Sequence, residues 1–101
     1  MTITRTIGNY HDSSNARIRK IGQATGPASY TTGGDPLTPA ALGLGQVEVV
    51  LFEAFDNGTV VIIGVYQVVA QTVKFYDMTG AEIANGTNLS AYNARFEAIG
   101  H

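Results

Sequence analysis

The chain has 101 residues, of which 45% are hydrophobic and 14% are charged, and its formal net charge is −2. This length fits one domain with its own core, and the slight excess of acidic residues argues against general affinity for nucleic acid. The sequence has no cysteine, which excludes disulfides, thiolate zinc sites and thiol nucleophiles. We therefore expect a single globular domain over residues 1–101.

No segment predicts a membrane helix or a secretory signal. The longest apolar run, residues 60–70, is interrupted by Gly64, Tyr66 and Gln67 and is shorter than the roughly 20 residues that span a bilayer. The first residues lead into polar sequence rather than into an apolar segment. We expect a soluble protein that is made in the cytoplasm and has no membrane partner.

The N-terminal third predicts two strands that form an arm over residues 1–27, available for contacts. Residues 2–8 alternate isoleucine with threonine and arginine, residues 9–15 are polar and predict a loop, and residues 16–24 predict an exposed edge strand. Arg17, Arg19 and Lys20 would discourage further pairing of that edge. Residues 1–34 carry a net charge of +3 and residues 35–101 a net charge of −5. These charges either cover solvated faces or make a basic end that meets an acidic surface, such as that of a neighbouring copy.

The next segment predicts turns and one short helical turn. Gly26-Pro27 breaks the chain, a short extended piece follows at 28–32, and Gly33, Gly34 and Pro36 then predict a loop. Thr38 suits a helix N-cap, Pro39 the first helical position and Gly43 the C-terminal stop. The only helix we expect is this turn near residues 38–43.

Residues 46–55 and 59–69 predict a β-hairpin. They are rich in β-branched residues and are joined by Asp56-Asn57-Gly58, in which Asn57 and Gly58 suit a type I′ turn. Gly64 predicts a bulge or a close backbone approach. The face that carries Glu48 together with Val50 and Phe52 is only partly polar, which is typical of a surface covered by another chain. The hairpin is more apolar than one small core requires, so we expect a homo-oligomer, a trimer or a dimer, with these contact candidates: Val50, Phe52, Phe55, Val61 and Ile63.

The C-terminal third predicts strands at 72–77, 81–84 and 91–99. In the last of these, Tyr92, Ala94, Phe96 and Ala98 alternate with polar residues and should face the core. The whole chain then contains seven or eight short strands. We predict an all-β fold, an antiparallel β-sandwich or jelly roll.

Residues that could perform chemistry do not form a recognisable site. His11-Asp12 could be half of an acid–base pair, but His101 ends the chain, and Ser13 and Ser14 lack a nucleophile elbow. Asp56, Asn57 and Asp77 lack the spacing of a calcium loop. We expect no enzyme activity, no metal and no cofactor. Aromatic residues are either core or stacking platforms for sugars or single-stranded nucleic acid, and Tyr10, Tyr30 and Tyr76 are the freest to act as surface anchors.

Residues 29–44, which read SYTTGGDPLTPAALGL, resemble a signature of small virion proteins of tailed bacteriophages. In that signature, Tyr-x-x-Gly-Gly-x-Pro-Leu-Thr precedes Leu-Gly-Leu and a hydrophobic strand. Residues 73–76 and the turn at 85–90, NGTNLS, follow the same pattern, and the chain then ends in a strand closing on Gly100. The resemblance covers most of residues 28–101. It departs from the pattern at 65–69, where a Gly-rich turn containing Asp is expected and the chain reads VYQVV.

The resemblance is to capsid decoration or cement proteins, which are β-sandwich or jelly-roll modules that bind the outside of the head lattice and reinforce it. It implies a location on the capsid surface and the major capsid protein as partner. We expect the N-terminal arm and exposed tyrosines to make that contact, with these candidates: Arg5, Arg17, Arg19, Lys20, Tyr10 and Tyr30. The alternatives are a receptor- or carbohydrate-binding module of a head fibre or tail, and a component of the head–tail connector.

Overall fold

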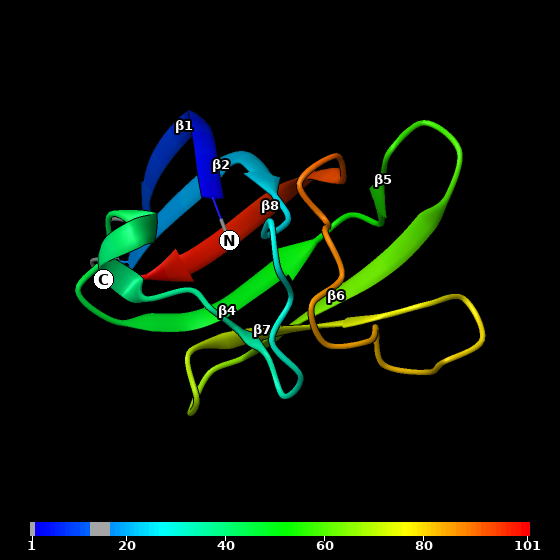
Figure 1. Cartoon of the computed structure of the whole chain (residues 1–101). Coiled ribbons are helices and arrows are strands. Elements are labelled where there is room, and N and C mark those ends of the chain that lie inside the picture. Colours follow the sequence, from blue (N-terminus) through cyan, green and yellow to red (C-terminus); the bar gives the residue numbers. More distant parts are fainter. Residues whose placement is uncertain (1, 13–16) are drawn as a thin grey trace.

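The computed structural model describes residues 2–12, as backbone apart from Ile3, and residues 17–101 (Figure 1). Its strands form one curled antiparallel sheet in the order β1-β2-β8-β5-β6-β7-β3, with β4 also paired to β8. The strands are β1 (Thr2–Asp12), β2 (Arg17–Thr25), β3 (Asp35–Pro36), β4 (Val47–Phe52), β5 (Phe55–Asp56), β6 (Val61–Gln67), β7 (Thr72–Tyr76) and β8 (Asn93–Gly100). The described residues contain one helical element, the 3₁₀ turn η1 (Pro39–Leu42). The predicted all-β fold with one short helical turn is confirmed.

The turn η1 forms for the reasons that the sequence indicates. Pro39 occupies the first helical turn, and Gly43 ends it with a φ of 74°, a left-handed conformation that glycine adopts without steric cost. Thr38 precedes the turn in an extended conformation, but its side chain makes no capping hydrogen bond. Proline and glycine are therefore the residues that delimit this turn.

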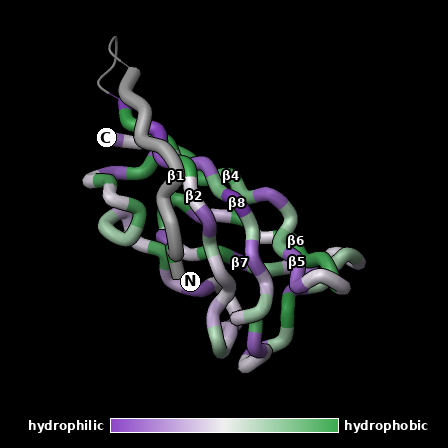
Figure 2. Tube along the Cα trace, turned by 90° about the horizontal axis from the view of Figure 1, so that it is seen from above, coloured by the Kyte–Doolittle hydropathy of each residue, from purple (hydrophilic) through white to green (hydrophobic). Residues whose placement is uncertain are grey.

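Strand β8 lies at the centre of the sheet. It pairs with β2 over its whole length and with β4 over its second half. Ala94, Phe96 and Ala98 are buried and Asn93 and Arg95 are exposed, as the alternation of the final strand predicts. Figure 2 shows hydrophobic and hydrophilic residues interleaved along the layer of β2, β8 and β4. One face of this layer is core and the other is open to solvent.

The prediction that residues 16–24 form an edge strand is wrong. Strand β2 lies between β1 and β8, and among the described residues β1 is the outermost strand on this side of the sheet. Arg17 and Arg19 remain hydrated because they lie on the open face of the sheet rather than at its edge. The loop predicted from residue 9 is also too long, since the pairing of β1 with β2 continues to Asp12↔Arg17. Residues 13–16 lie outside the described residues.

The predicted hairpin is present only in part. Strand β4 pairs with β8, and only β5 pairs with β6, through Phe55↔Ile62 and Asp56↔Val61. The loop spans 57–60, and Gly58 is its one residue with positive φ, so the predicted type I′ turn is wrong. The Asn57 side chain accounts for the difference, because its Oδ1 accepts hydrogen bonds from the backbone N–H groups of Thr59 and Val60 at 2.9 and 2.8 Å. An Asx-type cap of this kind favours the wider loop.

A bulge in β4 decides which of its residues reach the core. The register with β8 shifts between Val47 and Val49, so that Val47 and Val50 are buried while Leu51 is 60% exposed. Phe52 is half-buried, with its ring centroid 5.3 Å from that of Phe55. The side chains from the two halves of the curled sheet meet in one hydrophobic cluster.

The centre of the core is aromatic. Phe75 makes edge-to-face contacts with Tyr30 and Phe55, at centroid distances of 5.6 and 5.0 Å, a geometry that adds to the burial energy. Gly64 of β6 allows the closest of these approaches, because a Cβ there would lie 2.8 Å from Cε1 of Phe55. The pairing of β6 with β7 is regular through Gly64↔Phe75. Of the two roles that the sequence leaves open for this glycine, the structure shows the close approach.

Candidate interaction surfaces

The two segments that carry the resemblance to phage proteins pack against each other. The N–H of Tyr30 donates to the carbonyl of Thr87 at 2.9 Å, and the N–H of Gly86 donates to the carbonyl of Tyr30 at 2.7 Å. The Thr32 N–H donates to the side-chain oxygen of Asn85 at 3.0 Å. Residues more than 50 positions apart thus form one interlocked structure, and Leu37 and Leu89 from the two segments are both 1% exposed.

Tyr30 is the centre of this interlock. Its hydroxyl donates to Oε2 of Glu82 at 2.7 Å and accepts from the N–H of Phe75 at 3.2 Å. Burial, followed by the hydrogen bond to Glu82, raises the pKa of Tyr30 to about 12. The Gly33 N–H, and after it the Tyr30 hydroxyl, lowers the pKa of Glu82. At 1% exposed, Tyr30 is a core residue, so its predicted role as a surface anchor is wrong.

The turn residues of the signature also have structural roles. Gly33 and Gly34 have φ values of 98° and 132°, a region that glycine occupies readily. A Cβ on Gly34 would lie 2.6 Å from Thr72 of β7. Pro36 follows in β3, opposite Thr72. These residues of the signature therefore build a corner of the fold.

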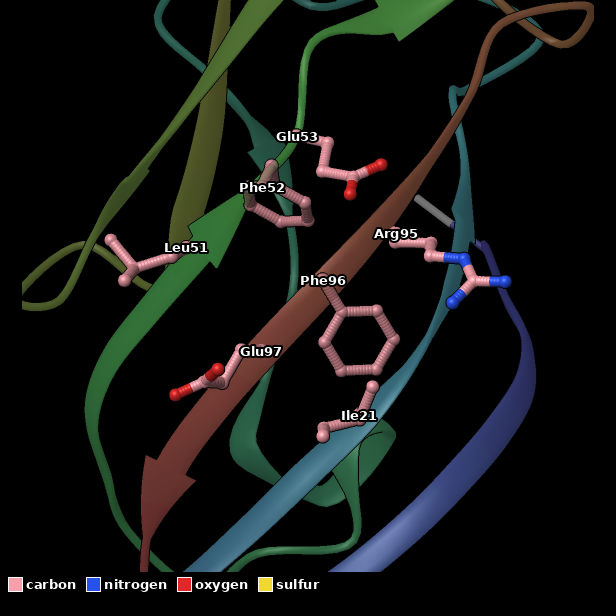
Figure 3. Close-up of a pocket in the computed structure, with 7 residues that line it drawn as sticks. All are labelled: Ile21, Leu51, Phe52, Glu53, Arg95, Phe96 and Glu97. Atoms are coloured by element: carbon pink, nitrogen blue, oxygen red, sulfur yellow. The ribbon is translucent and has the colours of Figure 1, made fainter.

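The first open surface is the groove face, which we define by Ile21, Leu51, Phe52, Glu53, Arg95, Phe96 and Glu97. Figure 3 shows these residues on β2, β8 and the end of β4. They line a groove of about 360 Å³. Ile21 and Leu51 flank Glu97 in register, so apolar and charged side chains share one surface. Such a mixture is typical of protein interfaces that form and dissociate.

Two ion pairs lie next to the groove. Nε of Arg17 lies 3.0 Å from Oε2 of Glu48, and a guanidinium nitrogen of Arg19 lies 3.1 Å from Oε2 of Glu97. Each partner is partly exposed, so the pairs order the surface more than they stabilise the fold. The Lys20 side chain lies on the other side of β2, next to Gly43: a Cβ added to this glycine would be 3.4 Å from Nζ of Lys20. The predicted basic cluster is therefore divided between two faces.

The second open surface is the hairpin face, which we define by Asp56, Val61, Ile63, Val65, Lys74 and Tyr76. On β6, Val61, Ile63 and Val65 are 38%, 43% and 45% exposed, while Ile62 between them is 2% exposed. The register places Asp56 opposite Val61, Tyr76 opposite Ile63 and Lys74 opposite Val65. An aliphatic row thus crosses the outside of this half of the sheet.

The residues predicted from the sequence are divided between these surfaces, the core and the undescribed side chains. Val61 and Ile63 are exposed on the hairpin face, as an oligomer contact requires. Val50 and Phe55 are 5% and 0% exposed, which is a correction, since they pack in the chain's own core. The side chains of Arg5 and Tyr10 lie outside the described residues. Sequence reasoning did not select Ile21, Leu51 and Val65, because their charged neighbours lie across the sheet: Glu97 is opposite Ile21 and Leu51, and Lys74 is opposite Val65.

Among the described residues, no group of three or more histidine, aspartate or glutamate side chains is placed to hold a metal ion. Asp56 and Asp77 use their oxygens in turns: Oδ1 of Asp56 accepts from the Gly58 N–H at 3.1 Å, and Oδ1 of Asp77 accepts from the Thr79 N–H at 2.9 Å. The Thr79 hydroxyl and N–H lower the pKa of Asp77. No described helix has the length and apolar character needed to cross a bilayer.

Comparison with known proteins adds no relative to this description. No family model, curated protein or solved structure matches the chain.

Proposed function

We propose that the protein is a structural protein of a tailed-phage virion that binds the outer capsid lattice and reinforces it. The observation that supports this most strongly is the hydrogen-bonded contact between the two segments of the resemblance, residues 29–44 and 85–90. The two short sequence matches lie far apart along the chain. Here they form a single structural unit, as expected if the resemblance reflects a shared scaffold.

In this proposal the groove face binds the major capsid protein. The face offers Leu51, which is 60% exposed, beside the ordered pair Arg19–Glu97. A single contact of this kind is modest, but a closed lattice repeats it over many equivalent positions. A copy made in the host cytoplasm would add to the finished head and act by adhesion, without catalysis or a cofactor.

Rebinding to purified heads stripped of this protein tests the proposal. We expect Leu51→Asp and the double variant Arg17→Gln/Arg19→Gln to lower the affinity for heads about tenfold, read as the protein concentration at half occupancy, because a groove contact worth about 1.4 kcal/mol changes affinity by that factor. Lys20→Gln is the matched control, since it removes a positive charge from the same strand on the opposite side. Melting temperatures establish that the variants are folded.

One outcome would reject the groove face as the contact, and two others would overturn the proposed function. Full occupancy by Leu51→Asp and by the arginine variant would remove the groove face from the contact. Absence from heads together with adsorption to host cells or glycans would favour a receptor-binding module. A copy number of about a dozen per particle, rather than hundreds, would place the protein in a connector or tail ring.

A further inference from the structure

We propose that the hairpin face binds a second copy of this chain across a two-fold axis. The proposed function supplies the setting of this contact, but the contact itself is a property of the isolated protein. Three outward β-branched side chains stand in a row on β6, at 38% to 45% exposed, and Tyr76 of β7 lies beside the central one. A row of this kind is an apolar patch of the sort that marks a protein contact.

The charges around the patch indicate which partner covers it. Asp56 lies opposite Val61 on the β5 side of β6, and Lys74 lies opposite Val65 on the β7 side. The two charges therefore occupy diagonally opposite corners of a patch centred on Ile63. Consider two copies whose patches face each other, related by a two-fold axis that lies in the plane between them and passes through Ile63. If this axis is perpendicular to the line from Asp56 to Lys74, the rotation places Asp56 of each copy against Lys74 of the other. The patch is thus complementary to itself in charge, as an isologous contact requires.

Other charged groups near the patch do not remove this complementarity. Glu82 lies beyond β7, bridged to Tyr76, and attracts Lys74. Its Oε2 already accepts from the Tyr30 hydroxyl and the Gly33 N–H, at 2.7 and 2.8 Å. Asp77 is likewise held by Thr79. Asp56 is exposed and uses one oxygen in its own turn, which leaves its charge on the surface to meet a lysine.

The size of the patch sets the strength of the contact. An apolar patch on a monomer of this kind covers roughly 300–600 Å², whereas a stable interface buries about 800 Å² per partner. We therefore expect weak, concentration-dependent dimers in solution. On a lattice that holds neighbouring copies within reach, the same contact would form at a high effective concentration. Of the trimer and the dimer that the sequence leaves open, the geometry favours the dimer.

Sedimentation analysis of charge variants tests this arrangement. Asp56→Lys and Lys74→Glu each place like charges at both corners of a homodimer, and we expect each to dissociate about tenfold more readily than the wild type. In an equal mixture, a heterodimer joins one variant with lysine at both positions to one with acidic residues at both positions. Both 56–74 contacts of this heterodimer therefore bring opposite charges together. The mixture should therefore associate more tightly than either variant alone. Ile63→Thr should weaken dimers, and Leu51→Thr, on the groove face, should leave them unchanged.

The result that supports the proposal is rescue in the mixture. Wild-type protein that stays monomeric at millimolar concentration, or a mixture no tighter than its components, would overturn it, whatever happens in capsid binding. If Asp56→Lys does not fold, because it loses the cap on the Gly58 N–H, Asp56→Asn takes its place. Its mixture with Lys74→Glu should then dimerise more tightly than Lys74→Glu alone, and equal affinities would refute the contact.

Discussion

Replacing Tyr30 with phenylalanine isolates the contribution of a single buried hydroxyl group. The ring is 1% exposed and packs edge-to-face on Phe75, and phenylalanine preserves both features. The substitution removes the hydroxyl oxygen that accepts a hydrogen bond from the backbone N–H of Phe75. Phe75 is 0% exposed, so this N–H would be left buried without an acceptor. Leaving a buried donor unsatisfied costs about 1–3 kcal/mol, against a total stability of about 5–15 kcal/mol for a domain of this size.

Thermal and urea unfolding followed by circular dichroism measure this loss. At about 4–8 °C per kcal/mol, Tyr30→Phe should lower the melting temperature by about 5–20 °C. Tyr92→Phe is the matched control, because Tyr92 is a partly buried tyrosine at the edge of the same core, and it should change the melting temperature much less. Equal effects of the two substitutions would refute the assignment of the stabilisation to the Tyr30 hydroxyl.

The same substitution alters the pH dependence of stability at both extremes. The pKa of Glu82 is lowered in the folded state, so its stabilisation is present above the unfolded pKa and is lost as the pH falls through the folded value. Tyr30→Phe should reduce this acid sensitivity without abolishing it, because the Gly33 N–H makes the larger contribution. The pKa of Tyr30 is raised to about 12, so wild-type stability falls as the pH rises from 10 towards 12. The variant should lose the part of this step that Tyr30 contributes and keep the part due to Tyr66, whose pKa is also raised by burial.

Three further substitutions test the packing. Gly64→Ala places a methyl group 2.8 Å from the Phe55 ring and should cost about 1–3 kcal/mol by overpacking, measured as a lower urea midpoint; an unchanged midpoint would contradict the close approach. Thr72→Val removes a buried hydroxyl that has no hydrogen-bond partner and should be neutral or stabilising by up to about 1 kcal/mol, so a clear destabilisation would show that the hydroxyl is satisfied. Val69→Ser, at a side chain that is 99% exposed, should change the unfolding free energy by less than about 0.5 kcal/mol, and a larger loss would indicate a contact there.

Local patterns predict the features of this fold that depend on neighbouring residues. The alternation in 91–99 correctly places Ala94, Phe96 and Ala98 in the core, because the side chains of a strand alternate between its faces wherever the strand is paired. Proline and glycine delimit η1 through their own backbone preferences. The all-β class follows from many such local signals.

Pairing between distant strands is not visible in such patterns. The charges of residues 17–20 suit an edge strand, yet β2 is internal because β8 supplies its second partner. One bulge between Val47 and Val49 exchanges the faces of β4, which buries Val50 and exposes Leu51. From the local sequence Tyr30 suits a surface anchor, but in the fold the distant segment 82–90 packs on it and forms hydrogen bonds with it.

The same limits apply to the interaction surfaces. The sequence selects Val61 and Ile63 of the hairpin face because they sit in a run too apolar for a solvated strand, and the structure shows them exposed; their role as an oligomer contact stays a prediction. The groove face joins residues of β2, β4 and β8, so its existence depends on the strand order. Local sequence patterns do not specify that strand order.

The central position of β8 has a consequence for how the chain reaches its folded state. Arg19 and Glu97, which meet across β2 and β8, are separated by 78 positions, so a long loop must close before the middle of the sheet exists. Topologies of this kind fold slowly, on the order of milliseconds to seconds. Until β8 inserts, β4 lacks its principal partner and an edge of β2 is open to other chains. The strand edges that this docking covers would be available for misassembly for as long as β8 is not in place.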